Sequence, residues 1–386
     1  MIYLFFLSIF LIILHFLLYP LIISLKKKEG KRDNTLKNYF PYVSYIIPAH
    51  NEEKIIEKKI RNVFSLDYPK ERMEVIVAND HSTDETVNIV KKLMAEFKEL
   101  KLIDTKRRGG KVNAQNEAVK MSKGEIIAFS DANTMWDRNS LKKLIFCLNE
   151  KGISCACGKI IYTNVEESEV SSSEGLYWKL ENKLKELESN FCSLTAINGG
   201  IYAIRREDYM FLNPMFSHDI AFPILLAKKK KRTIFCKNAL AFERSGTTIK
   251  DEWKRKTRMF GRIYYFIFKN LPLLLNPFFY NLKFYFSLFS HRIVRYTLPL
   301  WHTLLFISSA FLIREGIIFS LFFHLQILFM IFSLLGYFFG KKIKILNLFL
   351  YYTIFILSMI VGFVNFVTGR VKPYWEIAKT TREGVI

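Results

Sequence analysis

Residues 74–86 read EVIVANDHSTDET, and this stretch decides the fold of the middle of the chain. The β-branched run Val75-Ile76-Val77 is typical of a strand that is buried on both faces. The run stops at Asn79-Asp80, and short polar side chains continue as far as Asp84. A turn needs only one or two such residues, so the excess indicates a task beyond reversing the chain.

Two other apolar runs end in the same way. The run at 43–47 is followed by Pro48-Ala49-His50-Asn51-Glu52-Glu53, and the run at 125–129 by Ser130-Asp131-Ala132-Asn133. Helical patterns at 56–64, 87–97 and 111–121 separate the strands, and such alternation predicts βαβ units with a parallel sheet. Parallel strands end at one edge, where ligands bind. Helix capping explains any one cluster, but three clusters at the same edge favour a site.

Composition restricts the partners. The chain has 386 residues, 51% of them apolar, and a formal net charge of +22. Such a charge favours a nucleic acid, an anionic membrane leaflet or a phosphorylated substrate. The apolar residues gather at the two ends, which favours the leaflet. No basic run shows the aromatic interleaving or zinc spacing of a nucleic-acid module, so we expect no nucleic-acid partner.

The first apolar stretch predicts a membrane anchor. Residues 2–24 contain no formal charge apart from His15, and as a helix they extend about 33 Å, enough for a bilayer core. A cleaved signal peptide is the alternative, but the stretch lacks a basic n-region and a small-x-small cleavage site. Lys26, Lys27 and Lys28 follow it. By the positive-inside rule they place the middle domain in the cytosol, on a multi-pass protein of the cytoplasmic membrane.

Further apolar segments follow the middle domain. Candidate spans lie at about 296–313, 317–339 and 345–367, and the aromatic stretch 271–290 predicts an interfacial helix. Strict counting of spans leaves the tail after Gly369 outside, although its basic residues favour the inside. The expected organisation is an anchor at 1–25, a cytosolic domain at 40–245, membrane-interface helices at 246–294, about three transmembrane helices at 295–368 and a tail at 369–386.

The five cysteines have no paired spacing, which argues against a disulfide framework. Cys155 and Cys157 lie in an apolar stretch and are expected to be buried strand residues rather than metal ligands. A reduced, cytosolic middle domain fits this pattern.

The segments PAHNEE, NDHSTDET, RRGGKVNAQNEA and FSDANT resemble, in order and spacing, the inverting membrane glycosyltransferases of family 2. That family includes the chitin, hyaluronan, cellulose and poly-N-acetylglucosamine synthases. The resemblance covers about residues 43–261 and implies an α/β, Rossmann-like nucleotide-sugar transferase domain, called GT-A, flanked by transmembrane helices. It also implies transfer of a sugar from a UDP-sugar, UDP-GlcNAc or UDP-glucose, to a polysaccharide, cell-wall or lipid-linked acceptor.

The resemblance assigns the donor side residue by residue. Nucleotide binding is assigned to Pro48, Ala49, Asn51, Glu52, Asp80, Lys111 and Asp131. In this group Glu52 touches the ribose or base, and Asp80 accepts a hydrogen bond from the uracil ring. Lys111 approaches the diphosphate, with a solvated helix start as the alternative.

The same resemblance implies a divalent cation, Mg²⁺ or Mn²⁺, held against the diphosphate by Asp131 and Asn133 at the DxD position. Hard oxygen ligands suit such a cation. The family's second acid is Asn133 here, so we expect weaker metal binding. The usual Asp-Asp pair is Asn79-Asp80, and no role follows for Asn79.

The acceptor side is implied by the second half of the domain. Asp219 stands at the position of the family's general base, with a helix N-cap as the alternative. Trp178, on a predicted helix at 177–188, and the Gly199-Gly200 loop lie beneath the acceptor, where an ordinary turn is the alternative for the loop. The QxxRW motif keeps only an arginine, so Arg255 and Arg258 hold either the diphosphate or anionic lipid heads. Met259 replaces the motif's tryptophan, which weakens the case for a polymerase.

Three other functions remain open. A polyprenyl-phosphate sugar transferase needs little base catalysis, so Asp219 argues against it. A catalytically degenerate membrane partner of the same fold is compatible with Asn79, Asn133 and Met259. A transporter is disfavoured because the spans contain few charged residues.

Overall fold

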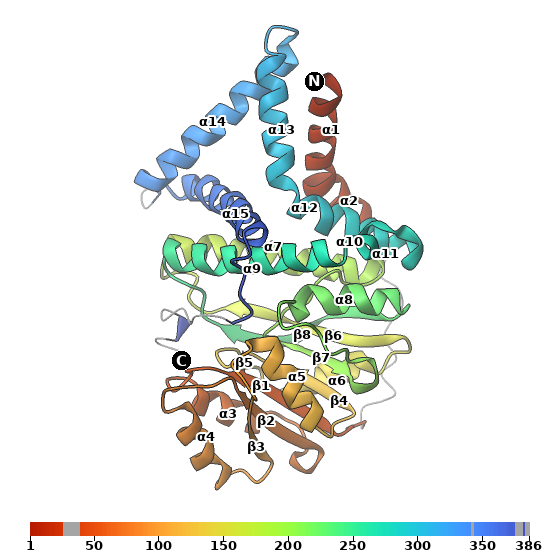
Figure 1. Cartoon of the computed structure of the whole chain (residues 1–386), viewed down its shortest axis with the longest axis vertical. Helices are drawn as coiled ribbons and strands as arrows, with labels where there is room; N and C mark the ends of the chain where they lie inside the picture. Colours follow the sequence, from red (N-terminus) through yellow and green to blue (C-terminus); the bar gives the residue numbers. More distant parts are fainter. Residues whose placement is uncertain (26–38, 341–342, 375–380, 383–386) are drawn as a thin grey trace.

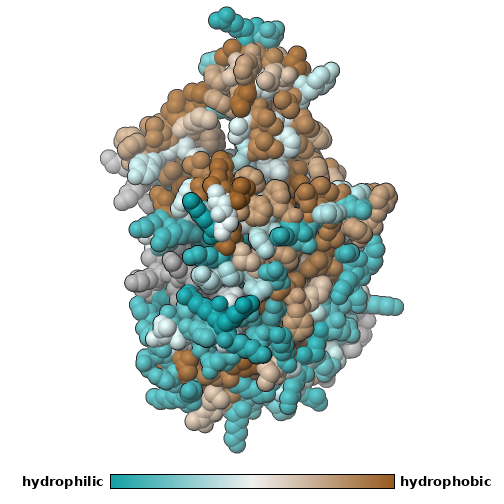
Figure 2. Space-filling view, in the orientation of Figure 1, coloured by the Kyte–Doolittle hydropathy of each residue, from teal (hydrophilic) through white to brown (hydrophobic). Residues whose placement is uncertain are grey.

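The computed structural model describes residues 1–25, 39–340, 343–374 and 381–382. A sheet domain forms one end of the molecule, and apolar helices project from it (Figure 1). Two long helices, α7 (Glu169–Phe191) and α9 (Ile249–Lys269), lie between these parts. Figure 2 shows apolar residues concentrated on the projecting helices and polar residues on the sheet domain, the division expected of a protein that is half in a bilayer.

Eight strands form one mixed sheet in the order β3-β2-β1-β4-β7-β6-β8-β5. Their bounds are β1 Val43–Ala49, β2 Met73–Asn79, β3 Leu100–Asp104, β4 Ile126–Phe129, β5 Met135–Trp136, β6 Ile153–Tyr162, β7 Tyr202–Arg205 and β8 Arg232–Glu243. The first four strands are parallel, as predicted. The second half of the sheet is not, because β7 runs antiparallel between β4 and β6.

Helices cover both faces of this sheet. They are α3 Ile56–Phe64, α4 Thr86–Met94, α5 Lys111–Met121, α6 Ser140–Leu148 and α8 His218–Lys228, together with α7 and α9. Ile56, Ile60 and Val63 recur at helical spacing on α3 and are all buried, which explains why this segment forms a helix against the sheet. One apolar core lies under α3, α4 and α6. A second lies under α5, α8 and α9.

Three helical stretches in the described residues are long and apolar enough to cross a bilayer: Ile2–Ser24, Ile317–Phe339 and Ile345–Val367. The first comprises α1 (Ile2–Ile13), a π-helical turn and α2 (Tyr19–Ser24), and the others belong to α14 (Ile317–Phe339) and α15 (Lys344–Val367). The span expected near 296–313 is the shorter helix α13 (Leu298–Phe311). Phe5 of α1 packs with Leu305 of α13 and Phe319 of α14, so these helices form one bundle.

The stretch expected as one interfacial helix is broken into short pieces. They are α10 (Leu271–Leu275) and α11 (Leu282–Ser287), with a 3₁₀-helical turn between them and a π-helical turn after α11. The short helix α12 (Val294–Tyr296) follows outside that stretch. Phe278 and Leu282 are largely exposed. Leu274 and Phe284 pack into the core under α8 and α9. One face therefore binds the sheet domain while aromatic and aliphatic side chains of the other are free to enter a membrane surface.

The last apolar helix, α15, runs beside α9. Lys256 Nζ donates to Tyr351 Oη at 2.9 Å, and the ring of Phe260 lies 5.3 Å from that of Phe355. Further along both helices, the ring of Phe268 lies 5.0 Å from that of Phe366. The contacts follow one another in the same order on both helices, which fixes α15 along the layer that covers the sheet domain (Figure 1).

The chain after α15 returns to the sheet domain. A Cβ added to Gly110 would lie 2.2 Å from the carbonyl oxygen of Pro373, and Arg382 pairs with Glu52. The described residues of the tail therefore contact the sheet domain. In Figure 1, α13 and α14 leave the domain and return toward it, and α15 follows α9.

Two of the cysteines form a bridge that was not expected. Cys147 of α6 and Cys236 of β8 form a disulfide, with Cα atoms 6.4 Å apart. The prediction of no disulfide is wrong for this pair, since sequence spacing says nothing about residues brought together by the sheet. Cys155 and Cys157 are buried on β6, as expected.

Candidate active site

The polar ends of the first two strands are bound to each other. Asn51 lies in the left-handed region with φ 54°, its side-chain oxygen accepts from the backbone of Thr83 at 2.7 Å, and its own backbone donates to Ser82 Oγ at 3.0 Å. Glu52 donates through its backbone to Thr86 Oγ1 at 2.8 Å. Most of the polar residues that follow β2 therefore support the loop that follows β1. Pro48 and Ala49 form the buried end of β1 beneath that loop.

Asp80 holds the glycines before α5. Its two carboxylate oxygens accept from the backbone amides of Gly109 and Gly110, each at 2.9 Å. Asp80 is completely buried, so these charge-assisted bonds fix the start of α5 against the end of β2. The structure therefore places Asp80 at the expected strand end, but its carboxylate is engaged with this loop.

Asn79, which had no assigned role, is a structural link. Its side-chain nitrogen donates to Asp104 at the end of β3 across 2.7 Å. Its side-chain oxygen accepts from the backbone of Ser82 at 3.0 Å. The amide of Asn79 thus joins β2, β3 and the turn. This link needs both a donor and an acceptor, and an ionised aspartate at this position could not donate.

Glu52 forms an ion pair with the C-terminal tail. Arg382 donates to its carboxylate from Nε at 2.8 Å and from a terminal nitrogen at 2.5 Å. The side chain of Glu52 is only 2% exposed and that of Arg382 13%. Burial lowers the pKa of Arg382, but the bonds to Glu52 outweigh it and raise the pKa above its ordinary value. This two-bond contact brings residue 382 to the loop that follows β1, where the nucleoside was predicted to bind.

Lys111 connects the donor and acceptor sides. Its ammonium contacts the Asp131 carboxylate and donates to the carbonyl of Gly199 at 3.3 Å. Burial lowers the pKa of Lys111, but the carboxylates of Asp131 and Asp219 outweigh it and raise the pKa. Lys111 therefore points into the site and is not a solvated helix start.

Asn133 is bound to an acid that sequence reasoning missed. Its side-chain nitrogen donates to Glu243 at 2.9 Å, and Thr134 Oγ1 donates to the other oxygen of the same carboxylate at 3.1 Å. Burial and the nearby Asp131 raise the pKa of Glu243, while the bond from Asn133 opposes them. Glu243 ends β8, and its only signal in the sequence was an acid directly after an apolar strand.

The oxygens of Asp131 and Asn133 fit a hard divalent cation. Because the nitrogen of the Asn133 amide is tied to Glu243, its oxygen faces away from that carboxylate. Within the described ranges no three or more His, Cys, Asp or Glu side chains come close enough to enclose a metal ion.

Asp219 lies against the glycine loop. It occupies the first turn of α8, after Ser217 at the N-cap, and a Cβ added to Gly199 would lie 2.4 Å from its Oδ1. Burial raises the pKa of Asp219, Lys111 opposes this, and Asp131 adds to it. The glycine is required because any side chain there would displace the carboxylate. Gly200 is equally confined, against Thr134.

The neighbours of Asp219 have different tasks. His218 bonds to Tyr202 Oη at 2.5 Å and packs among aromatic rings, and burial holds its pKa well below the ordinary value. Arg262 of α9 donates to the carbonyls of Pro214 at 3.1 Å and Met215 at 3.3 Å, and also to that of Phe216. Arg262 therefore holds the loop that leads into Asp219, a function that a charged helix face alone could not reveal.

The two arginines expected near the diphosphate differ. Arg255 is paired with Glu174 at 2.6 Å and Glu252 at 2.8 Å. Arg258 has no hydrogen bond or ion pair in the part of the chain that the structure describes, and burial, reinforced by Arg262 and Arg255, lowers its pKa to about 10. An arginine without an anionic partner, in the field of Asp131, is suited to receive an anion, whereas Arg255 already has two.

Trp178 lies on α7, as predicted, and its indole nitrogen donates to Glu174 at 2.8 Å. The ammonium of Lys185 stands 4.9 Å from its ring centroid. The tryptophan is thus held on the membrane side of the sheet domain, between α7 and the ion pairs of α9.

A buried lysine supports the acidic loop from below. Lys59 of α3 donates to Tyr45 Oη at 3.0 Å, to Ser130 Oγ at 2.7 Å and to the carbonyl of Thr134 at 2.5 Å. Burial lowers its pKa well below the ordinary value, against the opposing charge of Asp131. Lys59 thereby fixes both ends of the segment that carries Asp131. A lysine at an inward position of α3 was the signal that sequence reasoning overlooked.

Comparison with known proteins relates part of this chain to a known family. Residues 44–210 match the family model described as glycosyl transferase family 2. The chain carries a family 2 glycosyltransferase domain. A probable glycosyltransferase of Bacillus subtilis, YdaM, is 27% identical over 238 residues, which are 56% of this chain and 54% of that protein. A beta-monoglucosyldiacylglycerol synthase of a Nostoc species is 25% identical over 174 residues, 45% of this chain and 37% of that protein.

The chain spans about half or less of the length of these relatives. Over its whole length it shares a fold with a solved structure, the mannosyltransferase PcManGT from Pyrobaculum calidifontis in complex with GDP-Man and Mn²⁺. The TM-score is 0.71 at 20% identity, covering 95% of this chain and 99% of the other. The prediction of a family 2 glycosyltransferase with a Rossmann-like GT-A fold is confirmed.

Proposed function

We propose that this glycosyltransferase is an inverting membrane enzyme that transfers a sugar from a UDP-sugar to a saccharide or lipid-linked acceptor. The observation that carries the proposal is the contact of Lys111 with both Asp131 and Gly199, against which Asp219 is packed. The ammonium of Lys111 and the carboxylate of Asp131 are suited to a diphosphate. They therefore adjoin the carboxylate of Asp219, which is suited to act as the base. Direct displacement needs these groups on opposite sides of one anomeric carbon.

The donor lies across the ends of β1, β2 and β4. The loop of Pro48, Ala49, Asn51 and Glu52 surrounds the nucleoside, and Asp80 completes its pocket through the glycines that it holds. Lys111 and Arg258 face the diphosphate. Arg258 supports this role because it lacks an anionic partner among the described residues, whereas Arg255 serves the ion pairs of α9.

The acceptor lies between Gly199-Gly200, Trp178 and Asp219. Asp219 takes the proton of the acceptor hydroxyl as that oxygen attacks the anomeric carbon. The bond from that carbon to the diphosphate breaks, and its electron pair leaves with the UDP. One displacement inverts the configuration. The raised pKa of Asp219 suits the task, since a more basic carboxylate accepts a proton more readily.

Asp131 and Asn133 would hold a divalent cation, Mg²⁺ or Mn²⁺. When bound, such a cation offsets the charge that builds up on the leaving diphosphate. Lys111 and Arg258 share that task from the protein side, through fixed charges in a buried setting.

A lipid-linked acceptor fits the position of the site. Trp178 is on α7 and Asp219 is in the first turn of α8, and both helices lie on the side of the sheet toward α9 and the apolar helices (Figure 1). One relative is named beta-monoglucosyldiacylglycerol synthase. The catalytic domain and tail are on one side of the membrane, and Lys26–Lys28 next to the anchor favour the cytosol for that side.

A polyprenyl-phosphate acceptor is the second candidate, since Arg258 is available to an anionic acceptor as well. It would make Asp219 dispensable. A catalytically degenerate partner is disfavoured because Lys111, Asp131 and Asp219 are all retained and lie close together.

Nucleotide release separates these functions. Membranes with the full chain are supplied with UDP-GlcNAc, UDP-glucose and GDP-mannose, and the released nucleotide and the product mass are measured. We expect UDP release that Asp131→Ala abolishes and a product that carries one or more added sugars. If no donor is turned over, the proposed enzyme is excluded and the catalytically degenerate partner is supported. If Asp219→Asn is fully active, Asp219 is not the base and the polyprenyl-phosphate acceptor is supported.

A further inference from the structure

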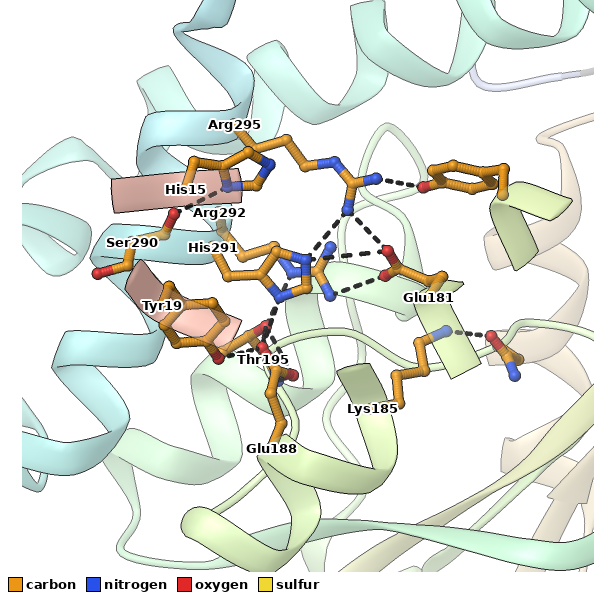
Figure 3. Close-up of polar contacts among 12 residues, drawn as sticks. His15, Tyr19, Glu181, Lys185, Glu188, Thr195, Ser290, His291, Arg292 and Arg295 are labelled. Atoms are coloured by element: carbon orange, nitrogen blue, oxygen red, sulfur yellow. Dashed lines mark hydrogen bonds and ion pairs between the residues drawn. The ribbon is translucent and has the colours of Figure 1, made fainter. Parts of the chain in front are cut away.

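A buried polar network joins the N-terminal membrane helix to the loop beside Asp219 (Figure 3). Its residues come from four parts of the chain: His15 and Tyr19; Glu181, Lys185 and Glu188; Thr195 and Asn198; and Ser290, His291, Arg292 and Arg295. Each of these ionisable side chains is at least nine-tenths buried. Charge buried to this extent is costly unless it is paired, so the arrangement requires an explanation.

Glu188 connects the membrane helix to the domain. Its carboxylate accepts from Tyr19 Oη at 2.7 Å and bonds to His291 Nδ1 at 2.5 Å. Thr195 donates to the same carboxylate from its hydroxyl at 3.1 Å and from its backbone at 3.2 Å. His15 adds a second link, from its Nδ1 to the carbonyl of Ser290 at 3.0 Å.

Glu181 is neutralised by the two arginines. Arg295 approaches one of its oxygens at 3.0 Å and Arg292 the other at 3.4 Å. Arg292 also donates from Nε to Thr195 Oγ1 at 2.8 Å. Glu181 and Glu188, the acids that α7 contributes to this network, therefore have their partners without Lys185.

Lys185 points out of this charge cluster toward the glycine loop. Its ammonium donates to Asn198 Oδ1, and Lys185 is only 2% exposed. Asn198 in turn donates from its side-chain nitrogen to the carbonyl of Gly158 at 2.7 Å. Because Glu181 and Glu188 are already paired, charge balance does not account for Lys185, and its directed bond to Asn198 does.

Asn198 begins the loop that touches Asp219. The next residue is Gly199, where a Cβ would meet Asp219 Oδ1 at 2.4 Å. The preceding residue, Ile197, donates its backbone amide to the carbonyl of Asp219 at 2.8 Å. A small movement of Asn198 would therefore change the distance between the loop and the carboxylate.

We propose that Lys185 is a positioning residue for sugar transfer. Through Asn198 it holds the Gly199 loop at the distance from Asp219 that the acceptor needs, and Glu188 and Tyr19 tie the same assembly to the N-terminal membrane helix. The inference rests on the proposed function for its effect on catalysis. Its effect on the loop is independent of that function.

The test compares three variants of the full chain in lipid nanodiscs of phosphatidylethanolamine and phosphatidylglycerol. Lys185→Met keeps the length and loses the donor, Lys185→Arg keeps a cationic donor, and Lys183→Met is the matched control from the exposed face of α7. Hydrogen–deuterium exchange of residues 194–201 reports on the loop. Binding of UDP with Mn²⁺, and UDP release from the donor that the wild type uses, report on the site.

We expect faster exchange at 194–201 in Lys185→Met alone, and a kcat reduced roughly 10- to 100-fold, the effect of losing one oriented bond to a charged group. The affinity for UDP should stay unchanged, and Lys185→Arg should recover part of kcat. Unchanged exchange and kcat in Lys185→Met, or an equal loss of UDP affinity, would overturn the proposal. A wild type that neither binds UDP nor releases it would contradict the proposed function instead, and exchange at 194–201 would still decide whether Lys185 holds the loop.

Discussion

The side-chain nitrogen of Asn133 lies 2.9 Å from the carboxylate of Glu243, although 110 residues separate them. An ionised carboxylate can only accept a hydrogen bond, so the amide must turn its nitrogen to Glu243 and its oxygen away. At the position where the family resemblance predicts a second acid, the chain thus has an amide whose orientation is controlled by Glu243 at the end of β8.

Replacing Glu243 with glutamine should weaken the binding of the divalent cation. A glutamine offers both a donor and an acceptor, so Asn133 would lose its fixed orientation. Loss of such an outer partner lowers metal affinity about 10- to 100-fold in known sites. Electron paramagnetic resonance of free Mn²⁺, titrated with the protein and UDP, measures it. Glu207→Gln, at an exposed position, is the control, and equal Mn²⁺ affinity in both variants would contradict the prediction.

Replacing Asn133 with aspartate should have the opposite effect. A second negative charge beside Asp131 strengthens the attraction for a hard cation. We expect half-maximal UDP release at a lower Mn²⁺ concentration than in the wild type. The prediction is wrong if the dependence of activity on Mn²⁺ is the same in the two proteins.

Replacing Asp219 with asparagine should abolish transfer and spare nucleotide binding. The amide keeps the shape that fits against Gly199 but cannot take a proton, and general base catalysis contributes about 10²- to 10⁴-fold. The two measurements are UDP release and the affinity for UDP with Mn²⁺. Turnover within a few-fold of the wild type would exclude Asp219 as the base.

The pKa of Asp219 also predicts two pH effects. Burial raises this pKa, so kcat/KM should fall with decreasing pH at a pH above the ordinary range of aspartate, which is about 4. For stability, a raised pKa means that the ionised form is less stable in the folded state than in the unfolded state. Asp219→Asn should therefore have a higher Tm than the wild type at neutral pH. The difference should shrink as the pH falls through the raised pKa of folded Asp219 and vanish below about 4, the ordinary pKa of aspartate. A Tm difference independent of pH would contradict this assignment.

Replacing Arg382 with glutamine should raise the KM for the donor. Glu52 would lose both of its bonds to the guanidinium, and a buried carboxylate without a partner protonates or turns away. Bonds to charged groups are worth about 1.5–3 kcal/mol, so we expect an increase of at least about tenfold. Lys372→Gln, on the exposed part of the tail, is the control. Equal KM values for Arg382→Gln and Lys372→Gln would show that the contact between Arg382 and Glu52 does not affect donor binding, and would contradict the prediction.

The strands and helices of the first half were predictable because their signals are local. The β-branched run at 75–77 and the spacing of Ile56, Ile60 and Val63 each determine an element without knowledge of the rest of the chain. The second half was harder, since the antiparallel strand β7 depends on pairing with β4 and β6. The disulfide was missed for the same reason: Cys147 and Cys236 meet only in the sheet.

The candidate site divides in a similar way. Asp80, Lys111, Asp131 and Asp219 follow strands or begin helices, and such positions can be read from a sequence. Glu243 and Arg382, together with the buried lysines Lys59 and Lys185, could not be found there, because an acid after a strand or a lysine in a helix is ordinary until its partner is known.

The sequence by itself determined that acid-bearing strand ends gather at one edge of a sheet and that apolar helices flank the domain. Those properties follow from hydrophobic periodicity and from the geometry of βαβ units. Only the tertiary structure decided what the polar cluster after β2 does. Asp80 and Asn79 bind the loops around them, Lys111 joins the donor and acceptor sides, and Arg382 returns to Glu52 from the far end of the chain. Hydrogen bonds and ion pairs act over about 3 Å in space, whatever the distance along the chain, so their partners appear only when the chain is folded.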